Sequence, residues 1–239
     1  MDAVAAQDAL KAFIEHLALN RHLSPHSVRA YTSDVEQYLD HTRAERGLKR
    51  PDLTVAAQRV VGATGPAPAP VNLEITGLFL ERFASVGDDL FIGGQPTEKA
   101  LRDLKAKGVT TVVNLRMPQE MAQIGFDEAA LLKELGITYV HIPLGGSPEN
   151  PYSPAALDRF TATMASAKGK VLLHCTIAWR ASHMWGAYLI RERKMAVADA
   201  LAHVRGVNLR ENAPFGGQQP IEGFLGRTLP EMPRPKPGF

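Results

Sequence analysis

Apolar and polar positions change their period along the chain near residue 72. From residue 5 to residue 46, apolar side chains recur at helical spacing, among them Leu10, Phe13, Ile14 and Leu17. From residue 72 onward, short apolar runs alternate with segments of helical period, which predicts strands separated by helices. Strands joined in this way favour a mainly parallel sheet with helices on both faces. The pattern therefore predicts an α/β fold with a central, mainly parallel sheet flanked by helices and preceded by a short helical segment.

Four runs in the alternating region have the length and composition of strands. They cover residues 89–92, 109–115, 137–142 and 171–173. Helices are predicted to follow Thr97 and to cover 126–135, a segment around Leu157 to Met164, and about 196–205. Ligands of such sheets bind beyond the carboxyl ends of the strands. Residues 114–116, the loop 143–151 and Cys175 all follow strand ends, so we expect them at one edge.

The same patterns divide the chain into four parts. We predict a helical hairpin at 1–48, a linker at 49–72, the α/β domain at 73–211 and a tail at 212–239. The linker contains Gly62-Ala-Thr-Gly-Pro-Ala-Pro-Ala-Pro70, a composition that is not expected to bury a core. The last part is rich in Gly and Pro and is predicted to be extended.

Composition narrows the function classes. The chain has 239 residues, of which 45% are hydrophobic, enough for one sizeable domain with appendages. A net charge of +2 gives no strong polyanion footprint, so nucleic acid is not an expected partner. One cysteine excludes an intrachain disulfide and a cysteine-based metal site, and we expect neither metal nor cofactor.

No run has the length of a membrane span, and the start lacks signal-peptide features. The chain as written is expected to be cytoplasmic, and a different native start would instead allow a periplasmic or secreted location.

The only cysteine lies where a strand meets a helix. Cys175 follows the apolar run at 171–173, and Arg180 comes after four intervening residues, just before an apolar helical stripe. The free amides and positive dipole end of a helix N-terminus favour a thiolate and a bound oxyanion. A thiolate is the nucleophilic form of cysteine, and the planar fork of arginine fits phosphate or sulfate oxygens. We therefore predict Cys175 as a nucleophile and Arg180 as an anion ligand, rather than Cys175 as a small buried hydrophobe.

Neighbouring residues are given supporting roles. His174 is predicted to hydrogen-bond the loop, and Ser182 either donates to the sulfur or caps the helix. The amides of 176–180 are expected to bind substrate oxygens. Arg116, at a strand end, either adds positive charge to the pocket or forms a surface ion pair.

The general acid and the pocket wall have less distinct candidates. Glu149 is the only carboxylate in 143–153 and is nominated as the acid, the alternative being a solvated loop residue. Trp179 either lines the pocket beside the substrate or belongs to the core. The predicted substrate-binding set is Thr176, Ile177, Ala178, Trp179 and Arg116.

Residues 72–228 resemble the bacterial beta-lactamase-hydrolase-like phosphatase family, a branch of the cysteine-dependent dual-specificity phosphatases. The matching segments are Leu90-Phe-Ile-Gly-Gly-Gln-Pro96, Thr111-Val-Val-Asn-Leu-Arg116, Tyr139-Val-His-Ile-Pro143 and Leu172-Leu-His-Cys175 with Arg180-Ala-Ser182. The resemblance implies a cysteine-phosphatase-like fold, with Cys175 as nucleophile and Arg180 as phosphate ligand. The implied substrate is a phosphorylated small molecule or a phosphoprotein. Two features depart from most cysteine phosphatases, which have five residues between Cys and Arg and a glycine where Ala178 stands.

The start of the chain resembles a different family. The segment Leu23-Ser-Pro-His-Ser-Val-Arg-Ala-Tyr31 and its flanking helical pattern resemble the beginning of the core-binding domain of tyrosine recombinases, the phage integrases. Charge is balanced in residues 1–50, whereas phosphate binding needs a basic surplus. We therefore do not expect this segment to bind DNA.

Three functions remain open on the sequence. The first is hydrolysis of a phosphate monoester through a phosphocysteine at Cys175. The second is sulfur transfer through a Cys175 persulfide, because rhodanese-type sulfurtransferases also have four residues in this loop. The third is an inactive phosphatase-like binding module, which the loop residues Ala178 and Trp179 would favour.

Overall fold

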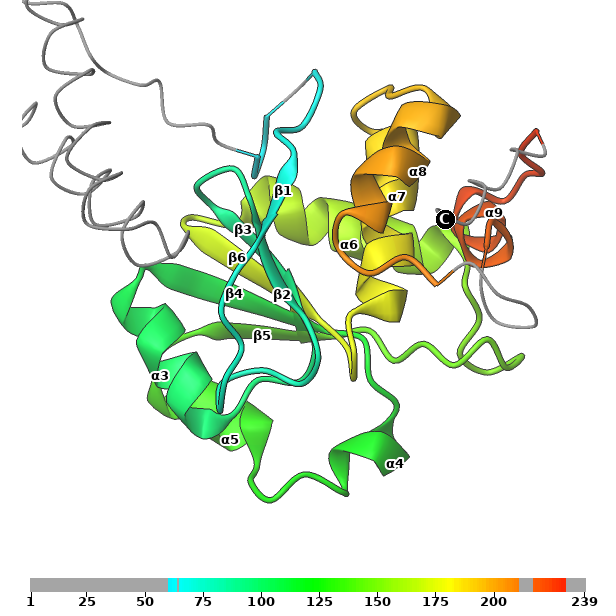
Figure 1. The fold of residues 1–239 in the computed structure, drawn as a ribbon. Coiled ribbons are helices and arrows are strands. Elements are labelled where there is room, and N and C mark those ends of the chain that lie inside the picture. Colours follow the sequence, from blue (N-terminus) through cyan, green and yellow to red (C-terminus); the bar gives the residue numbers. More distant parts are fainter. Residues whose placement is uncertain (1–59, 64, 211–216, 231–239) are drawn as a thin grey trace, which may run out of the picture. The chain divides into compact units, whose positions relative to one another are not determined.

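The computed structural model describes residues 60–63, 65–210 and 217–230, which lie in the second of two units of the chain, Gln58–Phe239 (Figure 1). The predicted hairpin at 1–48 lies outside the described residues, as do parts of the predicted linker and tail. Among the described residues, no helix combines the length and the apolar character needed to cross a membrane.

A six-stranded sheet forms the centre of the described domain. Its strands, in spatial order, are β1 (Pro70–Asn72), β2 (Phe83–Val86), β3 (Leu90–Gly93), β6 (Lys170–His174), β4 (Val109–Asn114) and β5 (Thr138–His141). β3, β6, β4 and β5 pair in parallel, while β1 and β2 are antiparallel additions beside β3. The predicted α/β class with a mainly parallel sheet is therefore confirmed. Strands β1 and β2 were not predicted.

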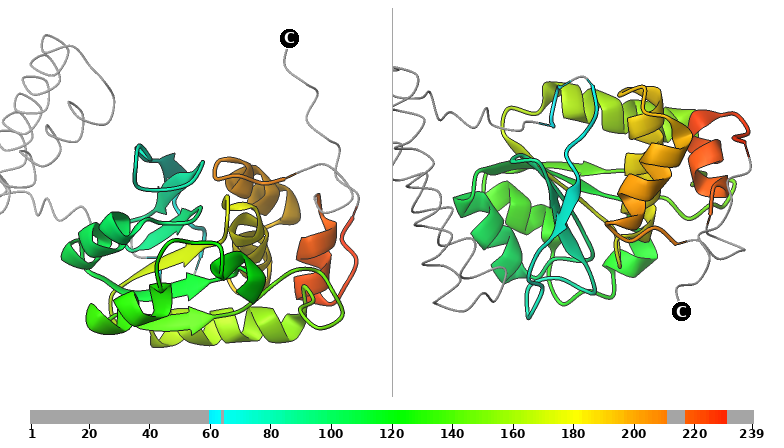
Figure 2. Two further views of the ribbon diagram at one scale, coloured as in Figure 1. Left: turned by 90° about the horizontal axis from the view of Figure 1, so that it is seen from below. Right: turned by 45° about the horizontal axis from the view of Figure 1, so that its top comes forward.

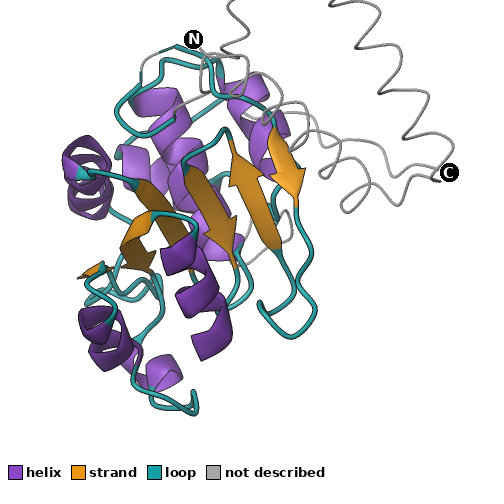
Figure 3. Cartoon of the chain, turned by 90° about the vertical axis from the view of Figure 1, so that its left-hand side faces the viewer, coloured by secondary structure: helices purple, strands orange, loops and turns teal. Residues whose placement is uncertain are grey.

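Helices cover both faces of the sheet (Figures 1, 2 and 3). They are α3 (Glu98–Ala106), α4 (Pro118–Met121), α5 (Glu128–Glu134), α6 (Pro154–Ser166), α7 (Trp179–Arg191), α8 (Val197–Arg205) and α9 (Gln219–Leu225). Strand β6 divides its side chains between the two sides, because alternate residues of a strand point to opposite faces. Leu172 packs in the cluster that includes α3 and α5, whereas Val171 and Leu173 pack in the cluster that includes α6 to α9.

Side-chain caps set the starts of three helices. The side chains of Thr97, Asp127 and Ser153 accept hydrogen bonds from the amides three residues later, which satisfies one orphan donor in each first turn. Pro154 follows Ser153 at the first position of α6, where a proline needs no amide partner. These local signals explain why helix starts were readable from the sequence.

Part of the predicted linker belongs to the core. Val60 and Val61 are buried, and the carboxylate of Asp89 accepts hydrogen bonds from their amides, the shortest at 2.6 Å from Val60. Arg193 donates to the carbonyls of Val60 at 3.1 Å and Ala63 at 3.0 Å, and also to Gly65 and Pro66. The predicted linker at 49–72 therefore includes core residues at Val60 and Val61, whereas no described residue of the stretch 62–70 is buried.

The predicted extended tail also contains a packed element. Helix α9 buries Ile221 and Phe224 completely, and the ring of Phe224 meets Tyr152 edge-on at 5.3 Å between centroids. Gly223 lets this helix approach the backbone of Tyr152, since a Cβ there would lie 2.6 Å from the Tyr152 carbonyl oxygen. The prediction of an extended tail was therefore wrong for 219–225, where a Gly-Pro composition serves close packing.

Candidate active site

Cys175 lies at the carboxyl end of central strand β6, directly before α7. Only 1% of the residue is exposed, yet it lines a pocket with a cavity volume of about 750 Å³. The ends of β3 and β4 flank it, as Gly93 and Asn114 pair with His174. The strand-end edge predicted to collect the site residues is thus the place where the pocket opens.

The loop after Cys175 turns its carbonyl groups outward. The Thr176 carbonyl accepts a hydrogen bond from the backbone N–H of Gln95 at 2.8 Å, and the Ile177 carbonyl accepts one from Asn208 Nδ2 at 2.6 Å. The Ala178 carbonyl accepts both the amide and the hydroxyl of Ser182, at 2.8 and 2.9 Å. In a trans peptide the N–H points opposite to the preceding carbonyl. The amides that follow these carbonyls therefore turn toward the inside of the loop, where an oxyanion would bind.

Ser182 performs neither of the two tasks predicted for it. Its hydroxyl donates back to the carbonyl four residues earlier, a pattern common for serine within a helix. The contact nevertheless ties the first turn of α7 to the loop, consistent with a supporting role.

Ala178 adopts the backbone conformation usually reserved for glycine. Its φ of 68° and ψ of 0° lie in the left-handed region, and the residue is fully buried. A side chain in this region costs about 1 to 2 kcal/mol relative to the right-handed one. The sequence identified this position by comparison with the expected glycine, and the structure shows that the turn is made regardless.

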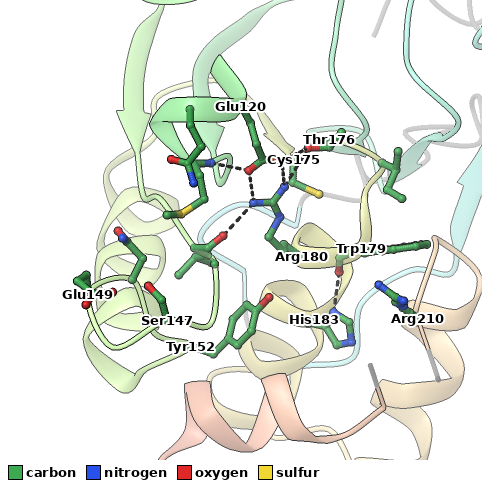
Figure 4. Close-up of a pocket in the computed structure, with 16 residues that line it drawn as sticks. Glu120, Ser147, Glu149, Tyr152, Cys175, Thr176, Trp179, Arg180, His183 and Arg210 are labelled. Carbon is green, nitrogen blue, oxygen red and sulfur yellow. Dashed lines mark hydrogen bonds and ion pairs between the residues drawn. The ribbon is translucent and has the colours of Figure 1, made fainter. Parts of the chain in front are cut away.

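Arg180 is held by a carboxylate that the sequence analysis did not select. Its Nη1 and Nη2 donate to Glu120 Oε2 and Oε1, both at 2.6 Å, which is a bidentate pair (Figure 4). Nη1 also donates to the Leu144 carbonyl at 2.9 Å, and Nη2 to the Thr176 hydroxyl at 2.9 Å. The guanidinium is thereby fixed beside Cys175 rather than free to swing.

Glu120 is itself locked in place. Its carboxylate accepts the Thr176 hydroxyl at 2.6 Å and the Met117 amide at 2.7 Å. Burial alone would raise the pKa of Glu120, but the hydrogen bonds from Arg180, Thr176 and Met117 outweigh it and lower that pKa to about 2. At neutral pH this group is a carboxylate and cannot serve as a proton donor.

A second carboxylate lies next to the loop but does not line the pocket. Glu128 is buried at the start of α5 and accepts His174 Nε2 at 3.0 Å, Asn114 Nδ2 at 3.0 Å and Gln95 Nε2 at 2.8 Å. Burial raises the pKa of Glu128, but His174 and the amide donors outweigh it, so the net shift is downward. Glu128 therefore orients His174. The Nδ1 of His174 has no hydrogen-bond partner among the described residues, so the predicted hydrogen bond from His174 to the loop is wrong.

Arg116 belongs to this buried group rather than to the pocket. It is 5% exposed, and its Nη1 donates to Gln95 Oε1 at 2.6 Å while Nη2 donates to the Glu120 carbonyl at 2.9 Å. It is not among the residues that line the cavity. The predicted contact with substrate does not fit this position. The alternative of an ion pair does, since Nε lies 4.0 Å from Glu120 Oε1, although this pair is largely buried rather than at the surface.

The pocket wall includes two aromatic side chains. Trp179 lines the cavity, in agreement with one of its two predicted positions, and Thr176 and Ile177 line it as well. Tyr152 contributes its ring, whose hydroxyl points toward Arg180 in Figure 4. Burial raises the pKa of Tyr152, so this phenol carries its proton at neutral pH.

Two further polar residues complete the wall. His183 Nδ1 donates to the Trp179 carbonyl at 2.8 Å, and burial lowers the pKa of His183 to about 4, so the ring is neutral at physiological pH. Glu149 is an exposed residue at the far side of the pocket in Figure 4, and a hydrogen bond with Ser147 lowers its pKa. The structure brings Cys175 and Arg180 together but does not bring Glu149 beside them.

Sequence reasoning missed Glu120, Tyr152 and Arg210 among the pocket residues. Glu120 follows Arg116 by one helical turn, and Tyr152 follows Glu149 in the same loop. For Glu120 and Tyr152, the position after a strand end was the available signal, since such positions were already expected to meet at one edge. Arg210 follows helix α8 and had no such signal.

Comparison with known families supports this geometry. A family described as DSP-PTPase phosphatase fused to NAD+ kinase matches residues 85–215, more than half of the chain. The chain belongs to this family. A second family, the phage integrase N-terminal SAM-like domain, matches residues 10–61, which confirms the resemblance noted at the start of the chain.

Among curated proteins, the beta-lactamase hydrolase-like protein of Xylella fastidiosa strain 9a5c is 26% identical to this chain over 145 residues. The match covers 59% of this chain and 33% of the relative, so the chain spans about a third of the length of that protein. The predicted resemblance to the beta-lactamase-hydrolase-like family is confirmed.

Solved structures overlap the domain partially. A Shewanella putrefaciens CN-32 protein of the DUF442 group is 25% identical, with 67% of this chain and 90% of that chain covered and a TM-score of 0.45. TpbA from P. aeruginosa in complex with pTyr is 15% identical, with 66% and 87% covered and a TM-score of 0.43.

Proposed function

We propose that the chain hydrolyses phosphate monoesters through a phosphocysteine formed on Cys175. The observation that carries the proposal is the convergence of the Cys175 thiol, the inward-turned loop amides and Arg180 at the start of α7. Membership of a phosphatase family supports it. The loop supplies a nucleophile together with donors placed for the charge that develops on phosphorus-bound oxygens.

The reaction has two steps. The Cys175 thiolate attacks phosphorus in line and forms an S–P bond, while the P–O bond to the alcohol breaks and the departing oxygen takes a proton. Water then attacks phosphorus, the S–P bond breaks, and phosphate leaves with the thiolate restored. The loop amides and Arg180 hold the non-bridging oxygens through both steps.

Arg180 presents a limited number of free donors to that phosphate. Its two terminal nitrogens already donate to Glu120, Leu144 and Thr176. An arriving phosphate therefore takes the Nε–H and competes with the Thr176 hydroxyl and Glu120 for the Nη2 protons. Glu120 acts as a positioning residue, because it sets the direction of the fork that the phosphate meets.

The proton for the leaving group has two candidate donors. Glu149 was nominated from the sequence, but its lowered pKa and its place at the far side of the pocket do not support that role. Tyr152 carries a proton at neutral pH and directs its hydroxyl toward Arg180. We therefore propose Tyr152 as the donor, with the hydrolytic water returning the proton in the second step.

The test is hydrolysis of a small aryl phosphate by the purified chain, with chelator present and Cys175→Ser as control. We expect turnover in the wild type and a loss of at least about a thousandfold in the variant. Intact mass after rapid acid quench should show an adduct of one phosphoryl group on Cys175. Equal turnover in both proteins would overturn the proposal, as would a gain of one sulfur on Cys175 from thiosulfate without any phosphatase activity.

A further inference from the structure

A second arginine lines the same pocket. Arg210 follows α8, and its Cζ lies 4.2 Å from the centroid of the Trp179 ring. Trp179 opens α7 and directly precedes Arg180, so the stacked arginine is tied to the loop that holds the first one. In Figure 4, Arg210 and Glu149 lie at opposite sides of the cavity. The guanidinium groups of Arg180 and Arg210 therefore line one cavity, and the exposed carboxylate of Glu149 lies on the side away from Arg210.

Stacking on the indole fixes Arg210 without consuming its donors. A cation–π contact engages the face of the guanidinium, and its N–H groups lie in the plane and remain available. Within the described ranges, no carboxylate pairs with Arg210. This differs from Arg180, whose charge is met by Glu120 at 2.6 Å. Among the described residues, Arg210 thus offers a positive charge at the pocket that no carboxylate meets.

The size and the remaining charges of the pocket fit a second anion. A volume of about 750 Å³ is in the range of sites that hold whole small molecules rather than a single phosphate. His183 lies beneath Trp179 and is neutral at physiological pH, so it adds no competing charge. Glu120 directs its carboxylate to Arg180, and Glu149 bonds Ser147.

We infer that the pocket recognises small phosphate monoesters that carry a second anionic group, a phosphate or a carboxylate. The group to be cleaved binds at Cys175 and Arg180, and the second group binds at Arg210. The assignment of the cleaved group rests on the proposed function, whereas the second subsite rests on the stacked Arg210 together with the size and charges of the pocket.

The test compares two series of substrates. Linear alkanediol bisphosphates of increasing length are assayed beside alkanediol monophosphates of the same length. We expect the wild type to prefer the bisphosphates at one chain length, and Arg210→Ala to lower the ratio of kcat/KM values about tenfold at that length. Arg227→Ala removes the same charge from an exposed position outside the pocket and should keep the ratio. A wild type without preference at any length, or a preference that survives Arg210→Ala, would overturn the inference.

A binding measurement separates this inference from the proposed function. Calorimetry on Cys175→Ser is run with the preferred bisphosphate and with inorganic phosphate, with and without Arg210→Ala. We expect the bisphosphate to bind more tightly, and the double variant to lose that advantage. If aryl phosphates are not hydrolysed but this advantage persists, the phosphatase proposal fails and the subsite stands. If hydrolysis occurs without the advantage, the reverse holds.

Discussion

Two glutamates lie close to the cysteine loop, one that lines the pocket and one that does not. Glu128 is fully buried and meets one histidine and two side-chain amides. Glu120 lies at the pocket, with 27% of its side chain exposed, and meets a guanidinium, a hydroxyl and an amide. The pKa of each is lowered against the effect of burial. A glutamate therefore supports the structure at position 128, whereas at position 120 a glutamate orients the reactive Arg180.

The difference lies in what each carboxylate would leave behind. Removal of Glu128 would leave three donors without their acceptor in a buried region. A buried donor without a partner costs about 1 to 3 kcal/mol. Removal of Glu120 would release Arg180 into a cavity that solvent can enter. We therefore expect removal of Glu128 to lower the stability of the whole domain, and removal of Glu120 to lower the rate of the reaction.

The largest effect is expected for Glu128→Ala. Loss of the carboxylate that joins His174, Asn114 and Gln95 should reduce the free energy of unfolding by about 3 kcal/mol, and Tm by about 6 to 12 °C. Thermal and urea unfolding measure this. Glu134→Ala, which breaks an exposed ion pair with Arg102, is the control and should cost less than about 1 kcal/mol. Equal losses of unfolding free energy in both variants would mean that the contacts of Glu128 stabilise the domain no more than an exposed ion pair does.

Glu120→Gln should act on catalysis more than on folding. The amide keeps the shape but not the charge that fixes Arg180, so we expect kcat/KM for an aryl phosphate to fall about ten- to a hundredfold. A lowered kcat, with a fall in Tm smaller than that of Glu128→Ala, would mark a positioning residue. A fall in Tm as large as that of Glu128→Ala, with kcat unchanged, would contradict the distinction between the two glutamates.

The pH dependence of stability offers a third comparison. Because the pKa of Glu120 falls from 4.5 to about 2 on folding, its carboxylate stabilises the fold above pH 4.5 and loses that contribution as pH falls toward 2. The contribution should be about 2 kcal/mol after allowance for partial exposure. Urea unfolding between pH 6 and pH 2 should show the gap between wild type and Glu120→Gln closing over this window. A gap that stays constant would show that the charge of Glu120 does not stabilise the fold.

Tyr152→Phe tests the proton donor at the pocket. If the phenol protonates the leaving oxygen, the variant should lose about tenfold in kcat for alkyl phosphates and little for nitrophenyl phosphate, whose leaving group needs no proton. Glu149→Ala is the matched comparison, and we expect it to be nearly silent with both substrates. A selective loss in Glu149→Ala instead would restore the acid nominated from the sequence.

The smallest effect is expected for Ala178→Gly. Relief of the left-handed conformation gains about 1 to 2 kcal/mol, and loss of the buried methyl group costs about 0.8 kcal/mol, with a further entropic cost for glycine. The net change in unfolding free energy should therefore stay within about 0.5 kcal/mol of zero. Chemical denaturation of the two proteins checks it, and a loss above 1.5 kcal/mol would mean that the methyl group packs better than the turn requires.

Local pattern predicted the parts of this molecule that depend on local chemistry. The apolar runs predicted the parallel strands, and the capping residues predicted the helix starts. The spacing from Cys175 to Arg180 predicted the anion-binding loop between them. Glu120 and Tyr152 escaped because their partners lie 60 and 28 residues away along the chain, in other elements. Helix α9 escaped for a related reason, since Gly223 is selected by its distance to Tyr152 and not by helix propensity.

Asp89 and Arg193 hydrogen-bond the backbone between residues 60 and 66, and these contacts also indicate where the domain begins. Composition places the boundary after the last proline of the segment, at about residue 72, whereas buried side chains place it before Val60. A fragment cut at the compositional boundary would lack its first strand and leave both charged side chains without the backbone they hold. In this chain a stretch of small residues and prolines is the outer wall of the domain, and its sequence simplicity is no guide to how dispensable it is.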